Sequence, residues 1–95
     1  MAKYQLVITA DWNDADYLTA ITPVTEAKLK KLKPIIKKIK NNNGDWDRMK
    51  TFNILTEEEY DFFFGYLPGG YPDGCDIHHI EEMYLQEIAK NKKLF

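Results

Sequence analysis

The sequence predicts an α+β fold, with an N-terminal β-hairpin, two helices, and a C-terminal segment that completes a three-stranded antiparallel sheet. Two segments rich in β-branched and aromatic residues, 4–11 and 17–24, flank a short polar turn and predict the hairpin. Two later segments repeat apolar residues at helical spacing. The 95 residues suffice for one domain, 1–95, with a small core.

The first helix is expected to begin after Thr25, which is a favourable N-cap residue. Pro34 lies inside the helical pattern and removes one backbone donor, so we expect a kink there rather than an end. The helix should stop at the sequence NNNG, residues 41–44. Its apolar positions recur at three-four-three spacing and should face the core: Leu29, Leu32, Ile36 and Ile39.

The second helix is expected to begin after Thr56, following an irregular segment at 45–53. Thr56 and Glu59 have the spacing of a capping box, and the glutamates of the first turn complement the helix dipole. We expect the helix to end at Pro68, which precedes two glycines. Its predicted core stripe comprises Tyr60, Phe63, Phe64 and Leu67.

The segment 75–89 fits two structures. Ile77, Ile80, Tyr84 and Ile88 recur at a spacing that fits a helix. However, an isolated two-stranded hairpin is only marginally stable, and a third strand beside it would stabilise the sheet. We therefore favour a strand, while the periodicity keeps a helix open.

Charge is divided between two parts of the chain. Residues 26–50 hold nine basic side chains against three acids, whereas residues 51–89 hold nine acids and no Lys or Arg. Such a division steers charged partners without indicating a chemistry. No apolar run is long enough to cross a membrane, no signal peptide is recognisable, and the chain has one cysteine, so we expect a cytoplasmic protein.

Candidate catalytic and metal-binding residues are few. Cys75, His78 and His79 include zinc-ligand types, but their spacing matches no established site and offers no second ligand pair. The turn sequence DWNDAD lacks the Gly and Glu that a calcium loop requires. We expect no metal, no cofactor and no catalysis. A thiol enzyme or small hydrolase built on Cys75 is the remaining enzymatic alternative.

The basic helix offers one candidate binding surface. Lys30, Lys33, Lys37 and Lys40 line one helical face, and such a row can follow nucleic-acid phosphates. Yet the row contains no arginine, which base recognition usually employs. A solvated face is favoured, and nucleic-acid binding is the alternative function.

The acidic half offers the favoured binding surface. Phe62 and Tyr66 are spaced i,i+4 and would form a second apolar face on the second helix. Aromatic anchors with a polar rim are typical of protein interfaces, and an acidic rim favours a basic partner surface. We therefore expect a non-catalytic protein-binding protein, and a homodimer could use the same patch. The expected interface residues are Trp12, Glu58, Asp61, Phe62, Tyr66 and Tyr71.

The stretch YQLVITADWNDADYLTAITPVTEAKLKKLKPIIKKIK, followed by LTEEEYDFFFGYLPGGYPDG and HHIEEMYLQEI, resembles a group of small uncharacterised proteins of bacterial phages and mobile elements. The resemblance spans most of the chain, and the DWNDADY hairpin with the lysine-rich helix is its most distinctive part. It implies an accessory protein that inhibits or modulates host machinery, including anti-defence proteins. It implies no particular site residues.

Overall fold

The computed structural model describes residues 3–12, 16–68, 77–89 and 92–93. The strands are β1 (Tyr4–Trp12), β2 (Asp16–Val24), β3 (Ile80–Glu87) and β4 (Lys92–Lys93). The helices are α1 (Glu26–Asn41), α2 (Trp46–Thr51) and α3 (Glu57–Phe64). The strands form one antiparallel sheet in the order β2-β1-β3-β4. The predicted α+β fold, with its hairpin and added C-terminal strand, is thus confirmed, and the short β4 is an addition.

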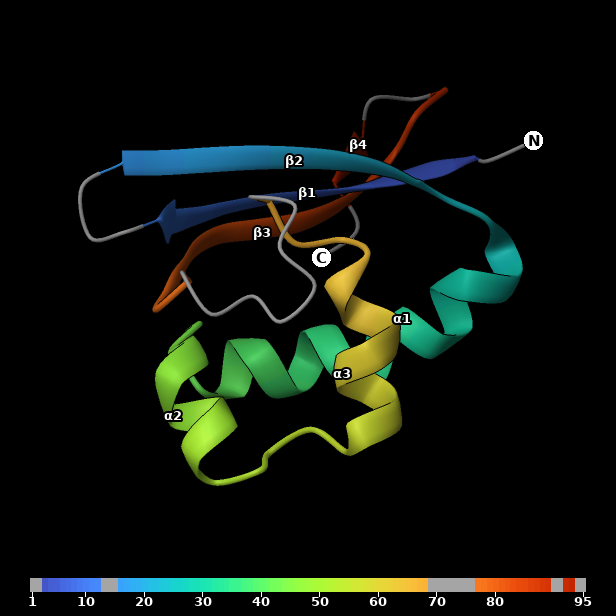
Figure 1. The fold of residues 1–95 in the computed structure, drawn as a ribbon. Helices are drawn as coiled ribbons and strands as arrows, with labels where there is room; N and C mark the ends of the chain where they lie inside the picture. Colours follow the sequence, from blue (N-terminus) through green and yellow to red (C-terminus); the bar gives the residue numbers. More distant parts are fainter. Residues whose placement is uncertain (1–2, 13–15, 69–76, 90–91, 94–95) are drawn as a thin grey trace.

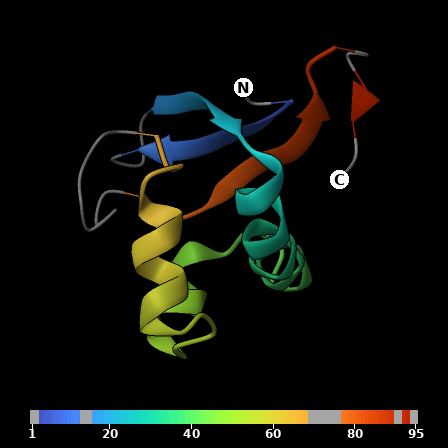
Figure 2. The same ribbon diagram turned by 90° about the vertical axis from the view of Figure 1, so that its right-hand side faces the viewer.

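The domain has two layers. The helices lie against one face of the sheet, and no described helix covers the other face (Figures 1 and 2). Side chains of the central strand β1 point alternately to the two faces, and Val7 is buried on the face without helices, at 6% exposed. Leu6 and Ile8 are fully buried beneath the helices, opposite Leu85 and Met83 of β3. The core therefore sits between the sheet and the helical layer.

α1 supplies the largest share of the helical core. Its predicted stripe is buried, together with Ile35, so the predicted register is confirmed. Thr25 is the N-cap, as expected, and its Oγ1 accepts from the backbone N–H of Lys28 at 3.4 Å. Pro34 lies on the exposed side, and the helix continues past it to Asn41. Burial of this stripe fixes the face that α1 turns to the sheet.

The end of α1 is closed by a Schellman motif. Gly44 N–H donates to Ile39 O at 3.0 Å, and Asn43 N–H donates to Lys40 O at 3.1 Å. Asn43 and Gly44 both have positive φ, 56° and 71°. Gly44 also lies close against β3, and a Cβ atom at this position would clash with Ile80 O. This position accordingly requires glycine for both its backbone conformation and its close approach.

The start of β3 is held by Asp11 of β1. Asp11 Oδ1 accepts from the N–H groups of His78, at 3.0 Å, and His79, at 2.7 Å. Asp11 lies in the hairpin but thus bonds a segment far along the sequence. This carboxylate joins the end of the hairpin to the third strand.

The irregular segment expected at 45–53 contains a helix, α2. Asp45 is its N-cap, accepting from Arg48 N–H at 3.1 Å, and Trp46 and Met49 are fully buried on one side. Six residues are too few to show a clear apolar period. The indole Nε1 of Trp46 has no hydrogen-bond partner among the described residues.

α3 ends earlier than expected. Its last residue is Phe64, with Gly65 as C-cap, and the chain then turns through i→i−3 bonds from Tyr66 and Leu67. Glycine disfavours helix interiors, and no basic residue stabilises the last turn. Leu67, which the sequence placed in the core stripe, is nevertheless buried, and the Tyr66 ring lies 5.6 Å from that of Phe62.

Candidate functional site

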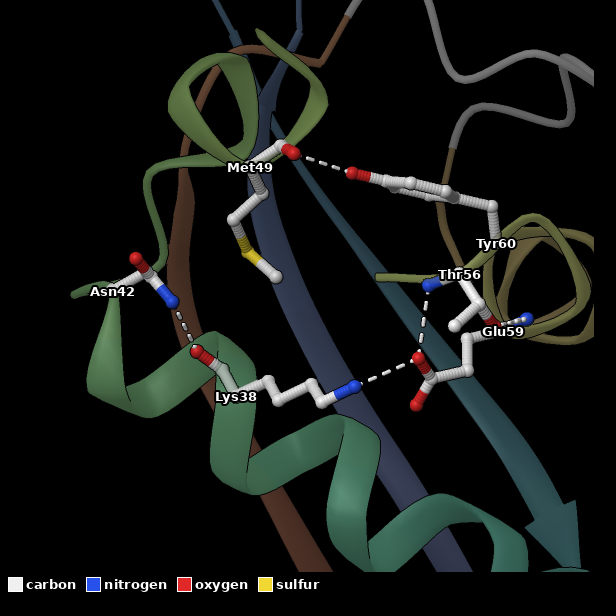
Figure 3. A network of polar contacts seen from close by, with 6 residues as sticks. All are labelled: Lys38, Asn42, Met49, Thr56, Glu59 and Tyr60. Atoms are coloured by element: carbon white, nitrogen blue, oxygen red, sulfur yellow. Dashed lines mark hydrogen bonds and ion pairs between the residues drawn. The ribbon is translucent and has the colours of Figure 1, made fainter. Parts of the chain in front are cut away.

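The acidic helix α3 is anchored at its N-terminus by the predicted capping box. Thr56 Oγ1 accepts from Glu59 N–H at 3.1 Å, and Glu59 Oε1 accepts from Thr56 N–H at 2.9 Å. The same Glu59 Oε1 also accepts from Lys38 Nζ of α1 at 2.8 Å (Figure 3). One carboxylate therefore caps α3 and joins it to α1.

The electrostatics of Glu59 follow from these contacts. Burial is the largest influence and acts to raise its pKa, because removal from water disfavours the charged form. Hydrogen bonds from Lys38 and Thr56, with the charge of Lys38, outweigh burial and lower the pKa below 4.5. Glu59 is thus a structural carboxylate held in its charged form.

Glu58 and Phe62, two of the predicted interface residues, lie in a groove between α1 and α3. The groove has a volume of about 280 Å³, and Lys31 and Ile35 line its α1 side. Lys31 Nζ lies 5.7 Å from the centre of the Phe62 ring, a cation–π arrangement. Phe62 is half-buried. Lys31 of α1 therefore already contacts part of the Phe62 ring within the molecule.

Tyr66 is not a surface anchor. Its side chain is 5% exposed and belongs to the core cluster, with its ring 6.3 Å from that of Phe63. The predicted pairing with Phe62 is present, since the two rings lie 5.6 Å apart, but the prediction that the pair forms an exposed face is wrong because Tyr66 is buried. The physical reason is the end of α3 at Phe64, after which the chain turns Tyr66 toward the core.

Asp61 lines a larger concave site between α2 and α3, of about 590 Å³. Tyr60 and Phe64 form an aromatic wall, with ring centres 6.4 Å apart, and buried Leu55 adds apolar surface. Exposed Glu57 and Asp61 bring negative charge to the site. The remaining lining residues are Lys50, Asn53 and Thr56. The combination is an apolar pocket with carboxylates at its rim, to which we refer as the acidic pocket.

Residues of α2 contact the aromatic wall of this pocket. Tyr60 Oη donates to Met49 O at 2.6 Å (Figure 3). Trp46 packs edge-on against Tyr60, with ring centres 5.6 Å apart and an interplanar angle of 83°. Burial raises the pKa of the Tyr60 phenol, and the charge of Glu59 adds to the rise. Sequence reasoning missed this pocket because it depends on α2; Asp45 followed by Trp46 and Met49 was the available signal.

The other predicted residues are placed as follows. The side chains of Lys30, Lys33, Lys37 and Lys40 are exposed along α1. Tyr71 and Cys75 lie outside the described residues, and for Trp12 the structure describes the backbone at the end of β1. The predicted interface set is thus divided between the groove, the acidic pocket and the core.

The two histidines face different carboxylates. His78 Nδ1 lies 2.8 Å from Asp47 Oδ2, and His79 Nδ1 lies 3.1 Å from Glu81 Oε1. Within the described part of the chain, no three metal-ligating side chains come together. Each histidine has a hydrogen-bonding partner of its own, which favours a structural role over a shared metal site.

Comparison with known proteins gives no relative: no family model, curated protein or solved structure matches the chain. In the described residues, no helix combines the length and apolar character that crossing a bilayer requires.

Proposed function

We propose that this protein is a non-catalytic binding protein that recognises a basic surface on another protein. The acidic pocket between α2 and α3 is the observation that carries the proposal. Its aromatic wall can contact the aliphatic stem of a lysine or arginine, and its carboxylates can pair with the charged end.

The charge around the pocket supports this choice of partner. Glu57, Glu58 and Asp61 are exposed on α3, and the described residues of 51–89 include no Lys or Arg. Of the pocket residues, Lys50 alone is basic, and Glu57 and Asp61 outnumber it. A net negative rim favours encounter with a cationic partner at low salt.

Binding that blocks the basic site of a host protein would make the protein an inhibitor. The resemblance to phage and mobile-element proteins motivates this reading, including an anti-defence role, and a cytoplasmic location accords with it. These finer assignments rest on that resemblance.

A peptide array tests the proposal. We expect the protein to retain peptides that carry Arg or Lys beside apolar residues, and Glu57→Gln with Asp61→Asn to abolish retention. The matched control is Lys30→Glu with Lys33→Glu, which changes charge on α1 instead of at the pocket. This variant should still retain the basic peptides. Failure to retain basic peptides, or equal retention by the pocket variant, would contradict the proposal.

Nucleic-acid binding through α1 is the second candidate, and one observation favours it. The helix holds seven lysines against one glutamate, and Lys30, Lys33 and Lys37 are exposed without an ion pair among the described residues. Such a row can neutralise phosphates without reading bases. We place it second because lysine rows are also ordinary solvated helix faces.

A further inference from the structure

The outer edge of β2 has no strand beside it among the described residues, since β2 is the first strand of the sheet. We propose that this edge pairs antiparallel with the β2 edge of a second copy of the chain. The product is a two-fold symmetric dimer in which one sheet runs through both copies. This interface is separate from the acidic pocket, which is lined by residues of α2, α3 and the segment between them; these two helices lie in the helical layer and not beside β2 (Figure 1).

The direction of the backbone groups in β2 can be derived from its neighbours. Asp11 N–H donates to His79 O at 3.0 Å, so Asp11 points its backbone groups toward the β3 side of β1. Alternation then directs Thr9 and Val7 to that side as well, and the register of β1 with β2 is regular. Their β2 partners consequently point their own backbone groups away from β1, toward the free edge. These partners are Tyr17, Thr19 and Ile21.

Two further observations agree with this assignment. Pro23, which has no N–H, belongs to the same alternating set and so removes no hydrogen bond to β1. Thr9 Oγ1 and Thr19 Oγ1 lie 2.9 Å apart, as expected for a non-hydrogen-bonded pair, in which side chains are closest. The N–H groups of Tyr17, Thr19 and Ile21 therefore lie at an open edge.

The side chains of this edge are apolar and incompletely covered. Tyr17 is 67% exposed and Ile21 is 62% exposed, both on the face of the sheet that the helices leave uncovered. On the helical face of the same strand, Leu18 and Ala20 are only half-buried. A strand added at this edge would cover apolar surface on both faces.

The charge of β2 selects a second copy as the occupant. A two-fold axis brings the strand against its own copy, so a strand that carries charge of one sign would repel itself. In β2 the first residue, Asp16, is charged, and residues 17–24 contain no charged side chain. Exposed edges are normally protected by charge, especially lysine. Residues 17–24 of the β2 edge lack that protection.

One register of the two β2 strands allows both backbone hydrogen bonds and favourable side-chain pairs between the copies. With Thr19 facing Thr19 of the second copy, Tyr17 faces Ile21 of the second copy. Each of these pairs then exchanges two backbone hydrogen bonds, because all of them point outward. Pairs of an aromatic with a β-branched residue are also favourable across strands.

Amide hydrogen exchange tests the pairing within one strand. In the dimer, the N–H groups of Tyr17, Thr19 and Ile21 should be protected, and the protection should rise with protein concentration. Leu18, Ala20 and Thr22 bond to β1 and serve as the internal control, protected at every concentration. Rapid exchange of the first set at the concentration of an NMR sample would overturn the proposal.

Sedimentation of two matched variants distinguishes edge pairing from packing of sheet faces. Thr19→Lys and Thr9→Lys both remove the contact between the two hydroxyls, on the same face of the sheet. Only Thr19→Lys places like charges across the proposed axis, so it should sediment as a monomer while Thr9→Lys remains a dimer. A monomeric wild-type protein, a dimeric Thr19→Lys variant, or loss of the dimer in both variants would contradict edge pairing.

Discussion

Lys38 of α1 and Glu59 of α3 form an ion pair with an Nζ–Oε1 distance of 2.8 Å, and this pair joins the basic and acidic helices. Glu59 belongs at the same time to the capping box of α3. The two oppositely charged parts of the sequence are therefore packed side by side rather than held at opposite ends of the molecule.

Glu59→Gln should lower the free energy of unfolding by about 1 kcal/mol at neutral pH, because glutamine can keep the cap but not the ion pair. The folded pKa of Glu59 lies below 4.5, so the unfolded state takes up the proton first as the pH falls. The stabilisation is thus complete above that value and is lost as the pH falls through the folded pKa. Urea unfolding of both proteins from pH 7 to pH 3 measures this; a difference that stays constant would argue against the ion pair.

Gly44→Ala should be strongly destabilising, by more than about 3 kcal/mol, because it combines positive φ with a clash against Ile80 O. Asn43→Gly is the matched control, one residue earlier in the same turn, and should be neutral or slightly stabilising. Thermal unfolding of the two variants checks the pair. Similar melting temperatures for both would mean that α1 and β3 do not approach each other as described.

Tyr66→Ser should destabilise the fold by about 3–5 kcal/mol, since the side chain is buried in the core. Phe62→Ser is the comparison, and it should cost clearly less because Phe62 is half-buried at the groove. Chemical denaturation measures both. Equal and small losses of stability in the two variants would indicate that Tyr66 is exposed. The exposed aromatic interface expected from the sequence would then be supported.

Lys33→Glu with Lys37→Glu tests the nucleic-acid alternative. If the exposed lysines bind duplex DNA, log affinity should fall with log salt, with a slope near −0.9 per phosphate contacted. We expect weak binding that is lost by physiological salt, measured by fluorescence anisotropy. If the wild-type protein binds tightly at physiological salt and the double variant does not, nucleic-acid binding becomes the favoured function instead of protein binding.

The hairpin, α1 and the start of α3 were predictable from the sequence because their signals are local. Strand composition, the stripe ending at Ile39, and the Thr56–Glu59 capping box all act within a few residues. The third strand was chosen on stability rather than pattern, since its periodicity also fits a helix. That choice was correct because β1 needed a partner on its second edge.

The candidate site was less predictable because it depends on how elements end and meet. The i,i+4 spacing correctly placed the rings of Phe62 and Tyr66 together, 5.6 Å apart, but it did not show that Tyr66, beyond the end of α3 at Phe64, is buried. The acidic pocket needed α2, whose six residues show little period. Asp61 was selected for its charge, whereas the aromatic wall of Tyr60 and Phe64 was assigned wholly to the core.

Binding of a cationic side chain in the acidic pocket is the central claim, and NMR titration with N-acetyl-arginine amide tests it most directly. We expect saturable shifts confined to residues of the pocket, including Tyr60, Asp61 and Phe64. The citrulline analogue is the control, because it keeps the shape and removes the charge, and it should cause much smaller shifts. Equal shifts with both compounds, shifts located elsewhere, or no shifts would contradict the claim.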